Sequence, residues 1–195
     1  MKIPKVSVVL TTYNRARVLD QTVQSILSQS YEDFELVVRD DASQDETEGI
    51  CRDFERQDHR VRYRRGLKNV GMPGNLNAGI EACSAEYVAN LHDGDLYEPT
   101  LLEKWTAALD ASPRAAFVFN AYRAIDANGR TICVFREPLP PCVPGSLLLE
   151  EIFFAAGALI VRFGARSWLD ARRTWQSDCS TPVLALWLML ICGCG

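Results

Sequence analysis

Two carboxylates flank a single glycine at the end of an apolar run, in the sequence Asp93-Gly94-Asp95. Carboxylate oxygens at this spacing suit a hard divalent cation such as Mg²⁺ or Mn²⁺, which completes its coordination with water and phosphate oxygens. The glycine permits a tight turn and lets a ligand approach closely. A cation held there could neutralise a departing diphosphate. Because Asp-Gly is also a common turn dipeptide, a turn with two solvated acids stays open as the alternative.

Other polar side chains that could bind a nucleotide follow the remaining apolar runs. Tyr13 comes after the first run, where its ring could stack on a planar base or simply close the rim of the core. Asp41 follows the second run, and its carboxylate could accept hydrogen bonds from a base or a ribose, or form an Asx turn. Asn77 and Gly79 are expected at a helix start, where free N–H groups attract phosphate; ordinary loop chemistry is the alternative.

These side chains need a scaffold, and the apolar runs predict one. Five runs have the length and composition of strands: Lys5–Leu10, Phe34–Asp40, Val61–Arg65, Tyr87–Leu91 and Ala116–Asn120. Segments of helical character separate them. This alternation predicts an α/β domain, a three-layer sandwich with a mainly parallel sheet. Ligands of such sheets bind beyond the carboxyl ends of the strands, so the polar residues should converge at one edge.

Local signals predict where helices and one hairpin begin. Capping-box spacing of Ser/Thr with Glu occurs at residues 43–46 and 100–103, so helices should start near both places. The stretch 69–79 is rich in glycine and is expected to form a loop that opens a helix running to about Cys83. Asn128-Gly129 lies between two strand-like runs, which predicts a β-hairpin.

Composition excludes several classes of protein. The chain has 195 residues, 48% of them hydrophobic, which is enough for one sizeable domain with a core. The formal net charge of -4 argues against a general nucleic-acid surface. The amino terminus lacks the apolar region of a signal peptide, and the seven cysteines are scattered without zinc-ligand spacing. We therefore expect a cytoplasmic chain with reduced thiols.

Four stretches resemble the family 2 glycosyltransferases, which have the A-type nucleotide-diphospho-sugar transferase (GT-A) fold. The stretches are VSVVLTTYNR, SILSQSYEDFELVVRDDASQDET, NVGMPGNLNAGI and YVANLHDGDLYEPTLLEKW, in the family's order and at its spacing. The resemblance is specific from about Pro4 to Trp105 and continues more loosely to Arg162. Chance agreement of four spaced motifs is improbable.

The resemblance implies roles for single residues around a nucleotide. Thr11 and Tyr13 correspond to the family's base-contacting residues after the first strand. Asp41 matches the acid that accepts a hydrogen bond from the base. Asn77 matches a position near the nucleotide pocket.

Asp93 and Asp95 correspond to the family's Asp-x-Asp signature. Asp95 would be the more direct ligand of Mg²⁺ or Mn²⁺, and Asp93 would also contact the nucleotide. The implied reaction moves a sugar, with inversion, from a UDP- or dTDP-sugar to a hydroxyl of a saccharide or a lipid-linked saccharide. The implied setting is bacterial cell-surface polysaccharide synthesis in the cytoplasm, with peripheral contact at the inner face of the membrane.

The chain departs from the family's pattern after Arg162. We expect a nucleotide-sugar-binding domain, the start of an acceptor-side region and an atypical tail, at residues 1–136, 137–162 and 163–195. The family's general base is an Asp or Glu in a downstream acidic motif, and the tail offers only Asp170 and Asp178, neither in a recognisable motif. A frameshifted or truncated reading frame and a tail that docks on a membrane or partner are both open. Without a base, the chain could be an inactive nucleotide-sugar-binding module.

Overall fold

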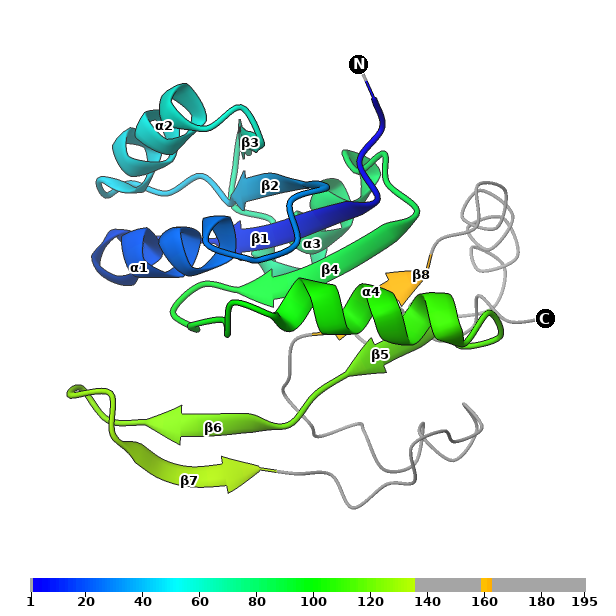
Figure 1. Ribbon diagram of the computed structural model, residues 1–195. Helices are drawn as coiled ribbons and strands as arrows, with labels where there is room; N and C mark the ends of the chain where they lie inside the picture. Colours follow the sequence, from blue (N-terminus) through cyan, green and yellow to red (C-terminus); the bar gives the residue numbers. More distant parts are fainter. Residues whose placement is uncertain (1, 136–158, 163–195) are drawn as a thin grey trace, which may run out of the picture.

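The structure, a computed structural model, describes residues 2–135 and 159–162. Figure 1 shows the order of the elements along the chain. They are β1 (Val6–Thr12), α1 (Ala16–Leu27), β2 (Phe34–Asp40), α2 (Thr47–Gln57), β3 (Val61–Arg65), α3 (Gly71–Glu81), β4 (Tyr87–His92), α4 (Leu101–Ala111), β5 (Phe117–Phe119), β6 (Tyr122–Ile125), β7 (Thr131–Phe135) and β8 (Leu159–Arg162). The alternation of strands and helices as far as β5 is the predicted α/β pattern.

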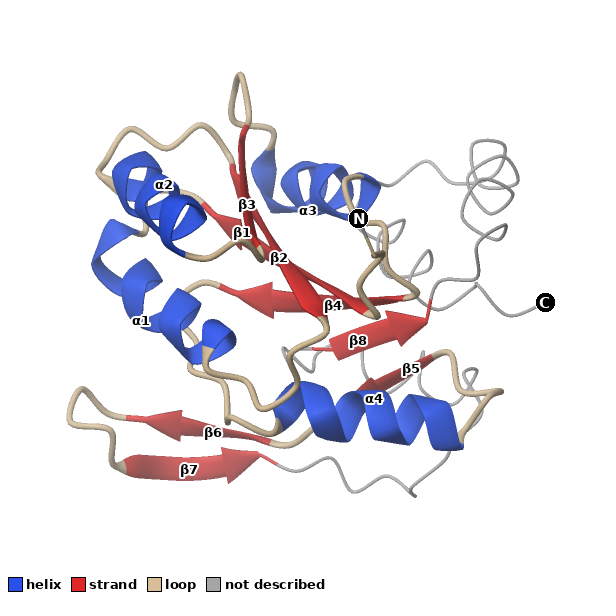
Figure 2. Cartoon of the chain, turned by 45° about the horizontal axis from the view of Figure 1, so that its top comes forward, coloured by secondary structure: helices blue, strands red, loops and turns tan. Residues whose placement is uncertain are grey.

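The main sheet has the strand order β3-β2-β1-β4-β8-β5. Strands β1 to β4 pair in parallel, whereas β8 runs antiparallel to both β4 and β5. Helices α1, α2 and α4 cover one face of the sheet and α3 covers the other (Figure 2). The predicted three-layer sandwich with a mainly parallel sheet is confirmed.

The central strand β1 is buried along its whole length, as expected for a parallel sheet covered on both faces. Its side chains alternate between two cores. Val8 and Leu10 face the larger core under α1, α2 and α4. Val9 faces the smaller core under α3, where it packs with Leu76 and Val88. Packing on both faces of the sheet therefore anchors β1.

The glycine-rich stretch is itself a helix, so the prediction of a loop at residues 69–79 was wrong. Helix α3 begins at Gly71 and lies unusually close to β1. A Cβ placed on Gly79 would lie 2.5 Å from Cγ1 of Val9. Glycine here permits close packing of helix on sheet, a use that outweighs its low helix propensity.

The two predicted capping boxes do not form, although helices begin near both of them. Ser43 precedes α2, and its hydroxyl donates instead to Asp40 at 2.5 Å. Glu103 in α4 accepts a hydrogen bond from the Ser30 hydroxyl at 2.7 Å. Neither helix start has a side-chain cap hydrogen bond. In both patterns another partner, Asp40 nearby in the chain or Ser30 from a distant segment, bonds to a side chain that the capping box would have used.

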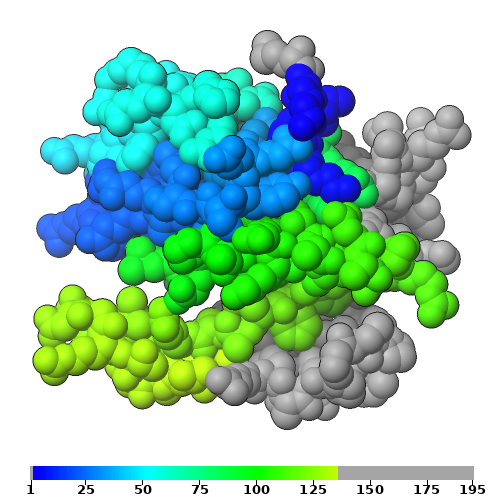
Figure 3. Space-filling view, in the orientation of Figure 1, coloured from blue at the N-terminus to red at the C-terminus, as the bar shows by residue number. Residues whose placement is uncertain are grey.

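The predicted hairpin at Asn128-Gly129 is confirmed. Strands β6 and β7 pair antiparallel, and Gly129 has the positive φ of 77° that such turns favour. The hairpin projects from the main body of the described residues (Figure 3). Strand β8 belongs to the range expected to begin the acceptor-side region, and it adds to the main sheet beside β4.

Candidate functional site

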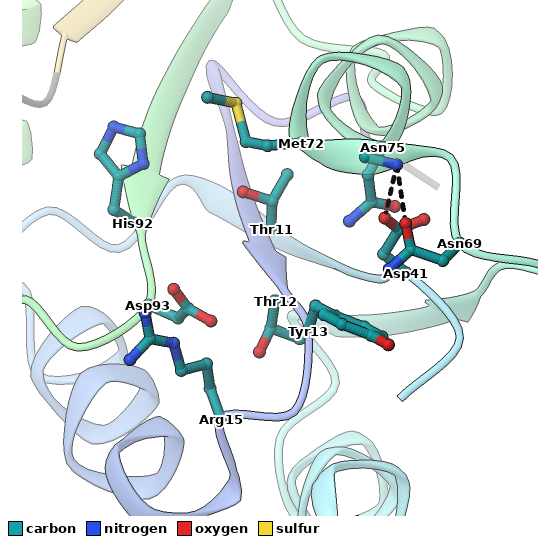
Figure 4. Close-up of a pocket in the computed structure, with 11 residues that line it drawn as sticks. Thr11, Thr12, Tyr13, Arg15, Asp41, Asn69, Met72, Asn75, His92 and Asp93 are labelled. Atoms are coloured by element: carbon teal, nitrogen blue, oxygen red, sulfur yellow. Dashed lines mark hydrogen bonds between the residues drawn. The ribbon is translucent and has the colours of Figure 1, made fainter. Parts of the chain in front are cut away.

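A cavity of about 300 Å³ lies at the carboxyl ends of β1, β2 and β4 (Figure 4). Its lining comes from these strand ends, from the loops that follow them and from the first two turns of α3. The lining residues are Thr11, Thr12, Tyr13, Arg15, Asp41, Asn69, Gly71, Met72, Asn75, His92 and Asp93. The predicted convergence of Thr11, Tyr13, Asp41 and Asp93 at one sheet edge is therefore observed.

Asp41 is buried and joins β2 to α3. Its carboxylate accepts a hydrogen bond from the backbone N–H of Val70 at 2.8 Å. It accepts another from the backbone N–H of Gly71 at 2.9 Å (Figure 4). A negative charge at a helix N-terminus is favourable because the free N–H groups there carry partial positive charge. Each carboxylate oxygen can accept a further hydrogen bond, so Asp41 can cap α3 and still bind a ligand.

The loop after β1 is tied to the loop after β2. Asn14 has a left-handed φ of 52°, and its backbone N–H donates to the Ser43 hydroxyl at 2.8 Å. Its side-chain oxygen accepts from the Gln44 N–H at 2.8 Å. These bonds hold the neighbouring Tyr13 at the rim of the cavity, where the residue is 43% exposed and its ring is available for stacking.

Asp40, which precedes Asp41, is fully buried and belongs to the scaffold of the site. Its carboxylate accepts hydrogen bonds from the Tyr63 hydroxyl at 2.6 Å and from Ser43, and Arg65 lies 3.6 Å away. Burial, together with the nearby Asp40 carboxylate, raises the pKa of Tyr63 well above its usual range, so its proton remains in this bond. The end of β2 is thereby fixed beneath the cavity.

The two acids of the Asp93-Gly94-Asp95 turn differ in position. Asp93 is half-buried and lines the cavity, whereas Asp95 is exposed and lies outside the lining. Gly94 has a φ of 89°, which a residue with a side chain rarely adopts. Asp93 accepts no side-chain hydrogen bond or ion pair from the part of the chain that the structure describes, and the Arg15 side chain points toward it (Figure 4).

This donor set fits a divalent cation of the predicted kind. The described residues include no cluster of three or more His, Cys, Asp or Glu that would enclose a metal ion. Mg²⁺ and similar cations commonly take one or two carboxylates from the protein and the rest of their ligands from water and substrate phosphates. Asp93 and Asp95, on one turn at the mouth of a cavity, match that arrangement.

Asn77 does not line the cavity, and the expectation that it lies at a helix start was wrong. Helix α3 begins at Gly71, which places Asn75 one turn further along on the cavity side. Asn75 is 2% exposed, and its side-chain N–H donates to the carbonyl of Arg39 at 2.8 Å. The helical period counted from Gly71 would have indicated Asn75, had the helix start been known.

Sequence reasoning also missed other lining residues, including Arg15, Asn69 and Met72. His92 lines the cavity, and its backbone is held at both polar groups by one phenol. The Tyr97 hydroxyl accepts from the His92 N–H at 2.8 Å and donates to its carbonyl at 3.1 Å. Burial raises the pKa of Tyr97 well above its usual range, which keeps the hydroxyl protonated for this pairing. Asp170 and Asp178 lie outside the described residues.

Residues 7–141 match the sequence model of the family described as Glycosyl transferase family 2. This chain belongs to glycosyl transferase family 2. EpsE of Bacillus subtilis is 29% identical to it over 187 residues, which are 95% of this chain and 66% of EpsE. The GalNAc(5)-diNAcBac-PP-undecaprenol beta-1,3-glucosyltransferase of Campylobacter jejuni is 36% identical over 94 residues, which are 47% of this chain and 30% of that protein.

Solved structures show the same fold for this family 2 chain. Staphylococcus aureus TarS 1-349 in complex with UDP-GlcNAc superposes with a TM-score of 0.71 at 18% identity, covering 95% of this chain and 54% of that one. The mannosyltransferase PcManGT from Pyrobaculum calidifontis, in complex with GDP-Man and Mn²⁺, gives 0.63 at 18% identity, covering 88% and 47%. The GT-A fold is thus shown, and this chain spans about half the length of these neighbours.

None of the helices in the described part of this family 2 chain has the length and apolar content needed to cross a bilayer.

Proposed function

We propose that the chain carries the donor-binding domain of a glycosyltransferase that moves a sugar from a nucleotide diphosphate to a hydroxyl acceptor. Residues 1–136 form this domain, and residues 137–162 begin the acceptor side. The observation that carries the proposal is the cavity at the ends of β1, β2 and β4, which brings together an aromatic ring, a buried carboxylate and the Asp93 carboxylate. Membership of family 2 supports the same assignment.

The nucleoside would occupy the side of the cavity next to α3. Tyr13 would stack on the base, since its ring is exposed at the rim. Asp41 would accept a hydrogen bond from a base N–H with the lone pairs that α3 leaves free. Thr11 lies on the floor between them. The UDP-GlcNAc and GDP-Man in the titles of similar structures support a nucleotide-sugar donor, with a UDP- or dTDP-sugar as the primary candidate.

The diphosphate would lie toward β4. Asp93 and Asp95 would hold Mg²⁺ or Mn²⁺, which when bound neutralises the charge of the departing diphosphate. Arg15 points into the same region and would add a positive charge beside the phosphates (Figure 4). The Mn²⁺ in the PcManGT complex supports a divalent cation in this fold.

The transfer would be a single displacement with inversion. The acceptor oxygen attacks the anomeric carbon, the bond to the diphosphate oxygen breaks, and a general base takes the hydroxyl proton. Asp170 and Asp178 are the candidates for that base. The name of the Campylobacter relative, which contains an undecaprenol-linked acceptor, supports a lipid-linked saccharide here and a place in cell-surface polysaccharide synthesis at the inner face of the membrane.

One observation favours a second candidate, a module that binds the donor without turnover. Among the described residues, the acids that line the cavity are Asp41 and Asp93. Asp41 caps α3 with both oxygens, and Asp93 is assigned to the cation. Neither is left to act as the general base within this part of the chain.

Calorimetry tests the proposal directly. UDP, dTDP and GDP are titrated into the full chain with Mn²⁺ and with EDTA, and a donor-hydrolysis assay follows for the nucleotide that binds. We expect one nucleotide to bind more tightly with Mn²⁺, and Asp95→Ala to remove that enhancement, whereas Asp20→Ala, an exposed acid on α1, leaves it intact. Binding without hydrolysis or transfer to any acceptor would favour the module. No binding of any nucleotide contradicts both candidates.

A further inference from the structure

We propose that the hydroxyl of Thr22, on α1, positions the two acids of the Asp93–Asp95 turn for a divalent cation. The inference rests on the proposed function, because it takes these acids as the cation ligands. Thr22 lies outside the cavity lining and acts through the backbone of the turn. It is therefore a positioning residue.

The environment of Thr22 makes its hydrogen bonds costly to lose. It is fully buried on the apolar face of α1, where Leu19, Val23 and Ile26 are also buried. A hydroxyl removed from water loses its hydration, and that loss is recovered only through hydrogen bonds within the protein. A valine would fill nearly the same volume, so shape alone does not account for a threonine here.

The bonds of Thr22 lie at the centre of the turn. Its oxygen accepts from the Gly94 N–H at 3.1 Å and donates to the Asp95 carbonyl at 2.9 Å. A competing acceptor, the Val18 carbonyl on its own helix, is farther away at 3.4 Å. One side chain thus orients the peptide unit that follows Asp93 and the peptide unit that follows Asp95.

The Tyr97 hydroxyl holds the backbone of His92, just before the turn, whereas the Gly94 N–H and the Asp95 carbonyl within it bond to Thr22. Glycine at the centre of the turn samples more backbone conformations than any other residue, and Gly94 occupies one that others avoid. The hydrogen bond within the turn, from the Asp95 N–H to the His92 carbonyl, is long at 3.5 Å. The backbone angles of the turn set the directions of the Asp93 and Asp95 side chains. The Thr22 hydroxyl, which bonds to this backbone, therefore determines the orientation of the two carboxylates relative to each other.

Thr22 is the first of three polar residues, two on α1 and one just after its end, that contact the segment after β4. Ser25 accepts from the Tyr97 N–H at 3.2 Å. Gln29 donates to the Glu98 carbonyl at 2.8 Å and accepts from the Leu102 N–H at 3.0 Å. Thr22 and Ser25 are three residues apart and share one face of α1, and Gln29 follows just after the helix ends at Leu27. The second half of α1 and the residues after it therefore support the segment, and Thr22 serves the part that carries the acids.

A cation is sensitive to this arrangement. Mg²⁺ requires oxygen ligands at about 2.0–2.1 Å in near-octahedral geometry, so a turn that samples several shapes binds it less well. Nucleotide contacts made by Tyr13 and Asp41 come from other elements and do not depend on Thr22. Loss of the hydroxyl should thus weaken the part of the affinity that depends on the metal and spare the rest.

The experiment compares Thr22→Val with Thr22→Ser and with a matched control, Thr106→Val. Thr106 is also a buried helical threonine, at 4% exposure, but its hydroxyl donates to carbonyls of its own helix, α4. Affinity for UDP, dTDP and GDP is measured by calorimetry with Mn²⁺ and with EDTA. Hydrogen exchange of the Gly94 amide is measured by NMR without ligand. Thr22→Ala repeats both measurements should the valine variant fail to fold.

We expect Thr22→Val to lower the Mn²⁺ enhancement of affinity about tenfold, the effect of losing hydrogen bonds of ordinary strength, and to leave the metal-free affinity within about twofold. Gly94 exchange should accelerate about tenfold or more. Thr22→Ser should restore both values, and Thr106→Val should change neither. An unchanged enhancement in Thr22→Val, or an equal loss with and without metal, overturns the positioning role alone. A wild-type chain whose nucleotide affinity ignores Mn²⁺ overturns both the role of Thr22 and the cation assignment, while donor binding stands.

Discussion

The carboxylate of Asp41, at the end of β2, accepts a hydrogen bond at 2.9 Å from the backbone N–H of Gly71, the first residue of α3. This contact lets a glycine-rich stretch begin a helix, because two free N–H groups at its start find a charged acceptor. The same carboxylate lines the cavity. The start of α3 and the lining of the cavity therefore share one side chain.

Asp41→Ala should reduce both stability and nucleotide affinity. Removal of the carboxylate leaves the Val70 N–H without an acceptor and the Gly71 N–H with only the Asn69 side-chain oxygen at 3.0 Å, which should cost about 0.5–2 kcal/mol of unfolding free energy. Loss of the bond to the base should lower affinity about tenfold. Urea unfolding and calorimetry measure the two effects.

Asp41→Asn and Asp20→Ala serve as comparisons. Asparagine keeps one oxygen acceptor and is itself a good N-cap residue, so Asp41→Asn should recover most of the stability and less of the affinity. Asp20 is an exposed acid on α1, and its removal should change stability by less than about 0.5 kcal/mol. An Asp41→Ala chain as stable as the wild type would contradict the capping role.

Gly79→Ala should destabilise the fold even though alanine favours helices. The new Cβ would lie 2.5 Å from Cγ1 of Val9 and 3.1 Å from Cγ of Arg39, so α3 would have to move away from the sheet. Overpacking of this kind costs about 1–3 kcal/mol. Thermal or urea unfolding measures the loss.

Gly49→Ala is the matched control. Gly49 is an exposed residue in α2, and its Cβ would meet nothing within 4 Å. The higher helix propensity of alanine should therefore stabilise the chain by about 0.5–1 kcal/mol. If both substitutions moved stability in the same direction, the close approach of α3 to β1 would not be the cause.

The strands were the most predictable part of the fold. The bounds predicted for β2 and β3 match the structure. Strand β2 is a mostly apolar run, and β3, with the sequence VRYRR, begins with alternating apolar and basic residues. The start of α3 was placed too late because glycine favours loops locally, whereas Asp41 and the packing on β1 are supplied by tertiary structure.

The site was predicted only in part, because the sequence pattern located the ends of the strands but not the start of α3. The rule that parallel strands end at one edge found Thr11, Tyr13, Asp41 and Asp93. The choice of Asn75 over Asn77 depends on the phase of α3, which follows from a helix start that sequence alone did not reveal. Domain boundaries and the roles assigned to single residues stay predictions.

Ala42→Gly should stabilise the chain. Ala42 has a φ of 65°, a left-handed conformation that costs an L-residue about 1–2 kcal/mol and glycine almost nothing. Part of this gain is offset because glycine is more flexible in the unfolded chain, which leaves a net of about 0.5–1 kcal/mol. Ala107→Gly, at an exposed position inside α4, should do the reverse and cost about 1 kcal/mol. Destabilisation by both substitutions would contradict strain at Ala42.

Glu35 should make stability depend on pH below neutrality. It is 8% exposed, and its carboxylate accepts hydrogen bonds at 2.6 Å from both the Ser7 hydroxyl and the Arg62 guanidinium. Burial alone would raise the pKa of Glu35, but the bonds from Ser7 and Arg62 outweigh it and hold this pKa below its usual value. The ionised form therefore stabilises the fold above the unfolded pKa of about 4.3, and this contribution is lost as pH falls through the lower, folded pKa.

Glu35→Gln tests this pH dependence. The variant should be less stable than the wild type at pH 7, because the partly buried Arg62 guanidinium loses its charge partner and Ser7 keeps only an amide acceptor. Its stability should then fall less steeply than that of the wild type as the pH drops below about 4.3, since glutamine does not titrate there. Urea midpoints measured across this range decide the matter, with the exposed Glu32→Gln expected to follow the wild type throughout. Parallel curves for wild type and Glu35→Gln would show that Glu35 is not the group whose protonation weakens the fold.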